Sequence, residues 1–339
     1  MFVLKHWYCS NKTWLSSLLL PLSYGFQWIV KERRKYQARH QYKSRVPIIV
    51  IGNIVLGGTG KTPVVEAICK FLHERSYIPA IVSRGVGGSC QNYPLLINEN
   101  TTPFISGDEP YMLYQKLKGC IPIIIDSNRV RAITYIEDNF PEINIIISDD
   151  GLQHYRMARS IEIIVVDGAR GFGNGLCLPA GPLREPITRL SQVDVVIING
   201  FSNYMFQCHN YYINLIPKYL VNLKTQEKKP IDYLINGHYS SHVHGVAAIG
   251  NPDRFFTALS VIGYQVIAHS FRDHHRYRFS DFKFNNPNVP IVMTHKDAVK
   301  CQRFAQAHWW YLKVYASIEN SFFDFLIHKL NNKASINST

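Results

Sequence analysis

The sequence lacks any cysteine pattern that would suggest a disulfide framework or a zinc site. Its seven cysteines are scattered over 339 residues, are odd in number and include no C-x-x-C pair. Internal repeats and low-complexity tracts are also absent, and the chain is 18% charged and 46% hydrophobic. This is a globular composition, which excludes collagenous, coiled-coil and wholly disordered proteins. Scattered thiols of this kind are typical of reduced cysteines in a cytosolic compartment.

Acidic residues are few compared with basic ones. The chain has 37 Lys and Arg against 24 Asp and Glu, which gives a formal net charge of +13. A charge of this sign favours an anionic partner, such as nucleic acid, an acidic membrane surface or a phosphorylated substrate. At about 150 residues per domain, the length predicts roughly two domains.

The first 45 residues differ from the rest of the chain in how charge and apolar residues are distributed. Residues 13–30 carry no charge, and residues 31–45 then hold seven Lys and Arg against the single acid Glu32. As a helix, the uncharged stretch would be about 27 Å long, slightly shorter than the ~30 Å hydrocarbon core of a bilayer. Pro21, Gly25 and Gln27 weaken it as a spanning segment, and no small-residue cleavage site of a signal peptide follows it.

Tryptophans in this region strengthen the case for a membrane element. Trp7, Trp14 and Trp28 are suited to an interface, and the adjoining cations would lie on the anionic cytoplasmic leaflet. We favour an interfacial or half-inserted helix over a single span, and either of these over a helix packed on the body. Because the basic run adjoins the apolar stretch, membrane anions explain part of the positive charge better than nucleic acid does.

From Val46 onward, short runs rich in Ile and Val alternate with helical patterns. The runs show little polar alternation, as expected for strands buried on both faces. Strands are predicted at 47–52, 78–82, 121–125, 143–148, 161–166 and 194–198, and then at 243–249, 265–269 and 289–294. Helices are predicted at 62–75, 110–117 and 252–260. This order indicates βαβ units and a mostly parallel sheet.

The predicted strands and helices fall into two groups, which are separated by a polar, charged stretch where we place the linker. The predicted organisation is a membrane-associating segment at 1–45, a core domain at 46–222, a linker at 223–235, a smaller α/β domain at 236–330 and a tail at 331–339.

The strongest motif is VPIIVIGNIVLGGTGKTP, residues 46 to 63. It predicts a buried strand, a glycine loop that turns backbone N–H groups toward phosphate oxygens, and a helix whose N-terminus adds positive charge. Lys61 would reach the β- and γ-phosphates, and the Thr62 hydroxyl is placed for Mg²⁺. The usual pattern G-x-x-x-x-G-K-[ST] requires glycine where this chain has Val55. The nucleotide-binding residues predicted here are Val55, Leu56, Gly57, Gly58, Thr59, Gly60, Lys61 and Thr62.

A second signal is the pair Asp149-Asp150 at the end of the apolar run INIIIS. An acidic residue at the carboxyl end of a buried strand is what an NTPase uses to hold Mg²⁺. Two adjacent carboxylates also need a cation to offset their repulsion. Alone, Asp-Gly after a strand is often only a turn. Together with the phosphate loop, the pair predicts a P-loop NTPase-like sheet flanked by helices.

Two other acidic segments are less specific. Asp108 and Glu109 precede an apolar helix, so they fit either capping of that helix or catalysis. In the segment from Phe271 to His275, Asp273 beside His274 would orient an imidazole for proton transfer. A surface turn and a metal cluster are alternatives, although no third ligand at a suitable spacing supports zinc.

Two loops present further candidates. LPAGPLREP, residues 178 to 186, presents Arg184, a good ligand for phosphate or an acidic headgroup, although a purely structural loop explains it equally well. THKD, from Thr294 to Asp297, follows a predicted strand and is placed to line a nucleotide base. In the guanine-reading pattern N-K-x-D the lysine stands one position earlier, so GTP is not indicated.

Taken in order, eight segments resemble the tetraacyldisaccharide 4′-kinase family of the lipid A pathway in Gram-negative bacteria. The segments are GGTGKTP, SRG, GDEP, DDGLQH, LPAGPLREP, IGNPDRFF, the Asp273-His274 pair and T-x-K-D. The resemblance extends from the N-terminal apolar stretch to about Lys300. Many NTPases share the P-loop alone, whereas the ordered set is specific.

The resemblance implies an ATP- and Mg²⁺-dependent kinase with two α/β/α domains joined by a hinge. The acceptor would be the 4′-hydroxyl of a tetraacylated disaccharide 1-phosphate and the product lipid IVA, made at the cytoplasmic face of the inner membrane. No nucleic acid and no obligate protein partner are expected.

The resemblance also implies residue roles. Asp108 matches the family's proposed base, His274 the histidine that works with it, and Arg184 an arginine near the transferred phosphate, with Lys61 in the phosphate loop. The implied Mg²⁺ site is made of Thr62, Glu109, Asp149 and Asp150. His295 stands where the family pattern leads us to expect Glu or Lys.

Two rival interpretations remain open from the residues alone. One is a P-loop GTPase or metal-delivery ATPase whose histidines pass on a metal, and nucleotide preference with metal content would discriminate it. The other is a membrane adaptor that only binds nucleotide. The pair Asp149-Asp150 argues against an adaptor, which has less need of a second carboxylate facing Mg²⁺.

Overall fold

The structure is a computed structural model that describes residues 6–9, 13–202, 204, 206, 208–236 and 241–337. Parts of four predicted segments, 1–45, 46–222, 236–330 and 331–339, lie outside these residues.

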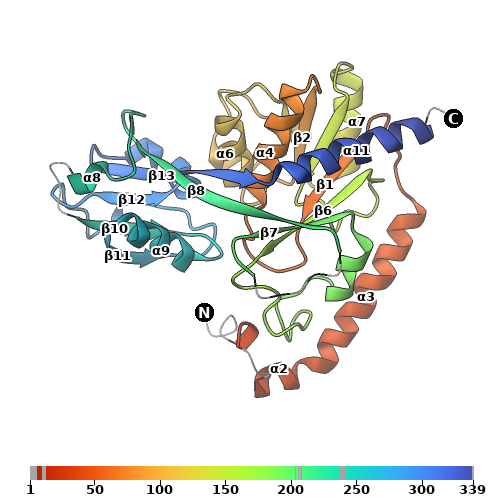
Figure 1. The fold of residues 1–339 in the computed structure, drawn as a ribbon, viewed down its shortest axis with the longest axis horizontal. Coiled ribbons are helices and arrows are strands. Elements are labelled where there is room, and N and C mark those ends of the chain that lie inside the picture. The colour runs from red at the N-terminus through yellow and green to blue at the C-terminus, as the bar shows by residue number, and fades with distance from the viewer. Residues whose placement is uncertain are drawn as a thin grey trace.

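The strands fall into two lobes joined by a long pair (Figure 1). The larger lobe contains β1 (Ile48–Gly52), β2 (Pro79–Ser83), β3 (Leu95–Leu96), β4 (Ile123–Ile125), β5 (Ile145–Asp149), β6 (Ile161–Asp167) and β7 (Val195–Asn199). The smaller lobe contains β10 (His242–Ala247), β11 (Gln265–Ser270) and β12 (Ile291–Thr294). The long pair is β8 (Asn210–Asn222), which also carries the short β9 (Lys228–Lys229), and β13 (Trp309–Ile318).

All these strands belong to one sheet, in the order β11-β10-β12-β13-β8-β7-β6-β1-β5-β2-β4-β3, with β9 beside β8. Neighbours are parallel except β8 with β13, β8 with β9 and β3 with β4. The predicted α/β fold with a mostly parallel sheet flanked by helices is therefore confirmed. The limits drawn between its domains stay a prediction.

Helices cover both faces of the sheet. In the larger lobe they are α4 (Lys61–Glu74), α5 (Pro103–Ser106), α6 (Asp108–Lys116), α7 (Arg129–Asn139) and α11 (Asn320–Asn337). In the smaller lobe they are α8 (Tyr233–Asn236), α9 (Pro252–Ile262) and α10 (His295–Cys301). Short 3-10 turns span Ile187–Gln192, Phe279–Asp281 and Gln302–Phe304.

Burial on both faces explains why the central strands are so apolar. All five residues of β1 are buried. Because side chains alternate along a strand, Ile49 and Ile51 pack in a cluster with α4 and α11, whereas Ile48 and Val50 pack on the other face with α7. The sequence places these strands to within about two residues.

The pair β8 and β13 was not predicted, and its sequence explains why. Side chains of β8 alternate between partly buried and exposed over most of its length. Its sequence therefore lacks the continuous apolar run from which the other strands are predicted. Pro217 lies within β8, where proline weakens a strand assignment, and the ladder shifts register beside it, between Lys313 and Val314. A helix after β13 was not predicted either; α11 buries Phe322, Leu326 and Leu330 in the larger lobe.

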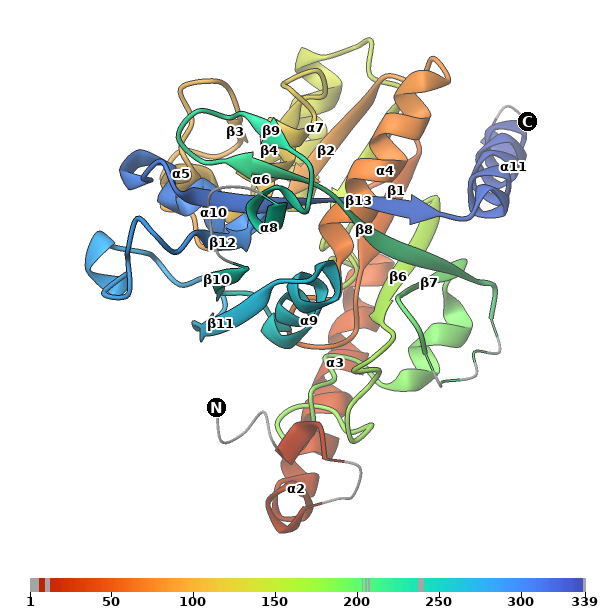
Figure 2. The ribbon, with the colours of Figure 1, turned by 60° about the vertical axis from the view of Figure 1, so that its left-hand side comes forward.

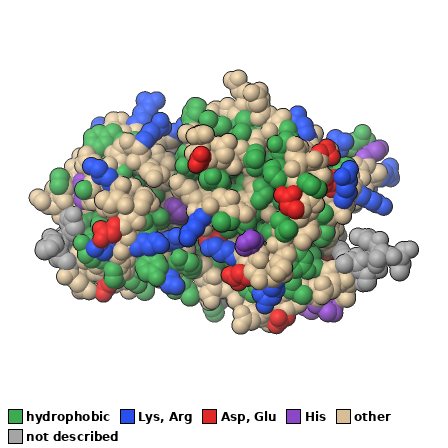
Figure 3. Space-filling model, turned by 90° about the horizontal axis from the view of Figure 1, so that it is seen from above, with side chains coloured by type: hydrophobic (Ala, Val, Ile, Leu, Met, Phe, Trp, Pro, Cys, Tyr) green, Lys and Arg blue, Asp and Glu red, His purple; other side chains and the backbone are tan. Residues whose placement is uncertain are grey.

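The N-terminal helices are α2 (Trp14–Leu18) and α3 (Leu20–Arg39), which extend beyond the body at one end (Figure 2). Among the described residues, we find no helix that combines the length and the apolar character needed to cross a bilayer. The opposite face, seen from above in Figure 3, carries basic, acidic and apolar side chains interspersed.

We expect Phe322→Ala to lower the free energy of unfolding by about 3–5 kcal/mol, because Phe322 is fully buried between α11 and the sheet. Urea unfolding followed by circular dichroism measures this. The control is Asp324→Ala, an exposed position on the same helix, with a change below about 0.5 kcal/mol. Equal effects at the two positions would contradict the packing of α11 described here.

Candidate active site

The loop between β1 and α4 is held in shape by two amide side chains. Asn53 donates from Nδ2 to the carbonyl of Gly57 at 3.1 Å, and Asn199 donates from Nδ2 to the carbonyl of Thr59 at 3.0 Å. Gly60 precedes α4 with φ +90°, and a Cβ there would lie 2.2 Å from Asn199 Nδ2. Only glycine fits this position, and the loop from Gly58 to Gly60 and the start of α4 line one cavity.

The first two residues of the predicted phosphate loop have other partners. Val55 is buried in a core cluster and forms a β-bridge with Leu183, and the Leu56 N–H donates to Pro182 O at 2.8 Å. Neither residue lines the cavity, whereas Gly58 to Thr62 do. At the place where the usual pattern has glycine, Val55 instead packs the loop onto the segment that carries Arg184.

A loop of the smaller lobe lies directly on the phosphate loop. A Cβ at Gly250 would lie 2.4 Å from the backbone N of Gly58. Arg170 donates from Nη1 to Gly250 O at 2.6 Å, and Asn251 donates from Nδ2 to Asp167 Oδ2 at 3.2 Å. The segment IGNPDRFF therefore closes one side of the cavity.

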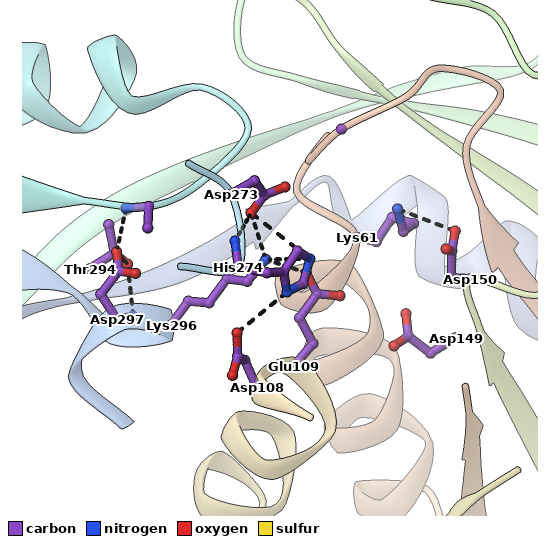
Figure 4. A network of polar contacts seen from close by, with 12 residues as sticks. Lys61, Asp108, Glu109, Asp149, Asp150, Asp273, His274, Thr294, Lys296 and Asp297 are labelled. Carbon is purple, nitrogen blue, oxygen red and sulfur yellow. Dashed lines mark hydrogen bonds and ion pairs between the residues drawn. The ribbon is translucent and has the colours of Figure 1, made fainter. Parts of the chain in front are cut away.

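Lys61 and Asp150 form the ion pair at the floor of the site (Figure 4). Lys61 Nζ lies 3.3 Å from Asp150 Oδ1, and Arg184 Nη1 lies 3.4 Å from Asp150 Oδ2. Burial works against ionisation of Asp150, but the charges of Lys61 and Arg184 outweigh it and lower its pKa to about 2. Asp150 is therefore an anion that lies between Lys61 and Arg184, the two cations that are predicted to contact the phosphates.

Asp149 ends β5 and is 1% exposed. Its Oδ2 accepts a hydrogen bond from Ser83 at 3.2 Å, whereas Oδ1 is buried without a hydrogen-bond partner. Burial and the nearby carboxylates of Glu109 and Asp150 raise the pKa of Asp149 to about 7. An orphaned buried oxygen among like charges is a site that a cation would stabilise.

The carboxylates of Asp108 and Glu109 do not cap α6. The N-cap residue is Gly107 and no side chain caps the helix. Asp108 Oδ2 instead lies 3.3 Å from His274 Nδ1, and Glu109 Oε1 lies 2.8 Å from Lys296 Nζ. Burial opposes the charge on Glu109, but Lys296 and Lys61 lower its pKa below the usual value. Of the two interpretations left open by the sequence, this geometry favours catalysis over capping.

The smaller lobe supplies the cations that meet these carboxylates. Lys296 Nζ contacts Asp273 Oδ1 at 3.1 Å and His274 Nε2 at 3.3 Å in addition to Glu109. Burial opposes the charge on Lys296, yet the two carboxylates raise its pKa above the usual value. Lys300 Nζ lies 3.8 Å from Asp108 Oδ2. Neither lysine was predicted as a site residue, although Lys296 is the lysine of the T-x-K-D segment.

A cavity of about 250 Å³ lies between the lobes and the phosphate loop. Glu109 and Lys296 line it near Lys61, and its remaining wall is largely apolar, with Pro217, Phe255 and Val314. Thr294 and His295 of the T-x-K-D segment also line it, and their contact with a nucleotide base stays a prediction. His295 stacks on Tyr311 at 4.4 Å between ring centroids, and burial with the charges of Lys116 and Lys313 lowers its pKa to about 3.

The donor set fits Mg²⁺ better than a transition metal. Within the described part of the chain, no group of three or more His, Cys, Asp or Glu side chains could hold a metal ion. The alternative interpretation of the segment from Phe271 to His275 as a metal cluster is therefore not supported. Mg²⁺ needs few protein carboxylates because phosphates and water complete its shell. The buried oxygen of Asp149 and the Thr62 hydroxyl in the first turn of α4 suit that requirement.

Comparison with known proteins gives consistent results. The family model described as tetraacyldisaccharide-1-P 4′-kinase matches residues 15–331. Proteins named tetraacyldisaccharide 4′-kinase are similar to this chain: that of Francisella philomiragia is 44% identical over 316 residues, and that of Francisella tularensis subsp. novicida is 45% identical over 317. Each alignment covers 91% of this chain and 97% of the relative.

A solved structure shares the fold. It is an "apo" form of LpxK from Aquifex aeolicus in complex with ATP, with a TM-score of 0.76 and 24% sequence identity. The match covers 93% of this chain and 99% of that one.

We expect His295→Gln to reduce the loss of stability in acid. The unfolded chain binds a proton on His295 near pH 6.5, whereas the folded chain binds it only near pH 3, so this residue favours folding above pH 6.5 and the benefit is lost as the pH falls. The free energy of unfolding should therefore decline less steeply between pH 6.5 and 4 in the variant, by up to about 1.4 kcal/mol per pH unit.

Urea unfolding at a series of pH values measures this slope. The matched control is His242→Gln at an exposed position, which should leave the slope unchanged. A wild-type slope in His295→Gln would show that His295 is protonated in the folded protein.

Proposed function

The chain belongs to the tetraacyldisaccharide-1-phosphate 4′-kinase family, and from this premise we propose how its site performs the reaction. The protein is a kinase that transfers the γ-phosphate of ATP to the 4′-hydroxyl of a tetraacylated disaccharide 1-phosphate, which yields lipid IVA and ADP. The observation that carries the assignment of roles is the convergence of Lys61, Asp150, Asp108 and His274 from both lobes on one site.

The donor side of the site binds ATP through backbone and charge. Residues Gly58 to Thr62, which include the start of α4, line the cavity, where their N–H groups would receive the β- and γ-phosphates. Lys61 supplies the cation, and the apolar wall accommodates the base. Mg²⁺, when bound, would be held by Thr62 and Asp149 and would neutralise charge on the phosphates. Of the four residues predicted for this site, Asp150 and Glu109 are instead paired with Lys61 and Lys296 in the structure.

On the acceptor side we assign Asp108 as the base. As the sugar oxygen forms its bond to the γ-phosphorus, the hydroxyl proton passes to the Asp108 carboxylate and the bond from phosphorus to the bridging β-oxygen breaks, which releases ADP. Arg184 stabilises negative charge on the transferred group from its position beside Asp150. The protein mainly positions the reactants and balances charge.

The positive charge around His154 includes an arginine of the N-terminal helices. His154, in the DDGLQH segment, has a pKa lowered to about 4 by burial and by the charges of Arg129, Arg84 and Arg33. Of these arginines, Arg33 belongs to α3. A region with this charge suits an acceptor that carries a phosphate and arrives along α3.

The orientation of α2 and α3 supports attachment to an anionic membrane surface. Two of their serines face the body: Ser23 Oγ donates to Cys177 O at 2.8 Å, and Ser16 is buried beside Asn174. Trp14 and Trp28 are 69% and 66% exposed, on the outside. Because acyl chains leave a bilayer at a cost of about 0.8 kcal/mol per CH₂, an enzyme for this substrate gains by working at the surface. We place it at the cytoplasmic face of the inner membrane, held by these helices.

We expect Lys61→Met to lower kcat/KM for ATP at least 100-fold, because it removes the cation at the phosphates. We expect Asp108→Asn to lower kcat about 100-fold or more, because it removes the base, and to leave the KM for ATP within threefold of wild type. Transfer of labelled phosphate from ATP to the disaccharide 1-phosphate in detergent micelles measures both. Asp138→Asn, exposed on α7, is the control and should keep wild-type rates. Substantial turnover by Asp108→Asn would refute Asp108 as the base.

We expect the double variant Trp14→Ser with Trp28→Ser to bind vesicles of phosphatidylcholine and phosphatidylglycerol at least fivefold more weakly, because it removes two exposed aromatic anchors. Flotation of the protein with vesicles at low and high salt measures binding. Val261→Ser, which is 81% exposed on α9, should have no effect. Unchanged flotation of the double variant would remove α2 and α3 from the membrane contact.

A further inference from the structure

Lys296 has more polar contacts than any assigned role explains (Figure 4). It lies in the first turn of α10, and its side chain is only 12% exposed. Its Nζ lies 2.8 Å from Glu109 Oε1, 3.1 Å from Asp273 Oδ1 and 3.3 Å from His274 Nε2. One ammonium group therefore joins a carboxylate of the larger lobe to two side chains of the smaller lobe.

The contact with His274 constrains the imidazole because an ammonium group can only donate hydrogen bonds. The ring atom that faces Lys296 must then offer a lone pair, and that atom is Nε2. The nearest carboxylate oxygen to Nε2, on Asp273, is 3.9 Å away, which is too far to accept a hydrogen bond. A proton on Nε2 would therefore face a cation and have no acceptor.

We propose that Lys296 is a positioning residue that holds His274 in the neutral tautomer with its proton on Nδ1, so that the ring donates to Oδ2 of Asp108. The Nδ1 to Oδ2 distance of 3.3 Å is compatible with this donation. The proposal deepens the proposed function and rests on Asp108 as the base.

This arrangement separates the roles of the two residues. His274 cannot take the proton of the sugar hydroxyl, because Nδ1 already carries one and the lone pair of Nε2 is held against the ammonium. Its donation to Oδ2 orients the carboxylate and leaves Oδ1 of Asp108 to accept that proton. Loss of Lys296 would free the ring to place its proton on Nε2, and a lone pair on Nδ1 would then face the carboxylate and misorient it.

Nitrogen-15 NMR of the imidazole side chains tests the tautomer directly, because the shifts of a protonated and an unprotonated ring nitrogen differ strongly. His274 is identified as the signal absent from His274→Ala. In the wild-type protein near pH 8 we expect protonated Nδ1 and unprotonated Nε2. In Lys296→Met we expect a shift toward protonated Nε2. Protonated Nε2 in the wild type, or an unchanged tautomer in Lys296→Met, would overturn the proposal.

Kinetics separate action through His274 from action through Glu109. Lys296→Met should lower kcat at least about tenfold in the wild-type background but less than about threefold in His274→Ala, since the two changes remove one function. A threefold or larger loss in His274→Ala would assign the effect of Lys296 to Glu109 and overturn the proposal. Lys283→Met, an exposed lysine of the smaller lobe, should match wild type.

The two experiments distinguish this inference from the proposed function. If Asp108→Asn keeps full activity, the base assignment fails whatever the tautomer is. If Asp108→Asn is inactive and His274 nevertheless carries its proton on Nε2, only the role of Lys296 fails.

Discussion

Charge balance among four carboxylates is the constraint on which the site depends. Asp108, Glu109, Asp149 and Asp150 come from two elements of the larger lobe and lie close enough for Glu109 and Asp150 to raise the pKa of Asp149. The larger lobe offsets Asp150 with Lys61 and Arg184, whereas the smaller lobe offsets Asp108 and Glu109 with the residues of α10 and the loop at 273–274. Ion pairs therefore join the lobes on this side of the site. The groups in these ion pairs include those to which we assign roles in phosphoryl transfer.

The parts of the fold that sequence predicts well are those with a single physical cause. Strands such as β1 and β5 are apolar because both faces are covered, and the loop ending in Gly60 needs glycine because Asn199 leaves no room for a Cβ. The candidate residues Lys61, Asp108, Asp150, Arg184 and His274 were predicted from motifs and are brought together in space.

Other features depend on contacts that no local pattern encodes. The strands β8 and β13 stabilise each other across the interlobe region, with Pro217 and exposed side chains that hide them from a periodicity search. Lys296 gains its importance from partners 22, 23 and 187 residues away. In the N-terminal helices Ser16 and Ser23 are buried against the body, whereas several large apolar side chains are exposed, which departs from the pattern of an ordinary amphipathic helix. This pattern suits helices whose outer face contacts a membrane rather than water.

The continuous ladder of β8 and β13 has a mechanical consequence. Backbone hydrogen bonds between Asn210–Asn222 and Trp309–Ile318 run from one lobe into the other, so the lobes are not tethered by a slack polypeptide. Any change in the angle between them must twist this two-stranded ribbon, which resists deformation and restores the original angle when the load is removed. The ribbon therefore limits how far the walls of the cavity between the lobes can move apart.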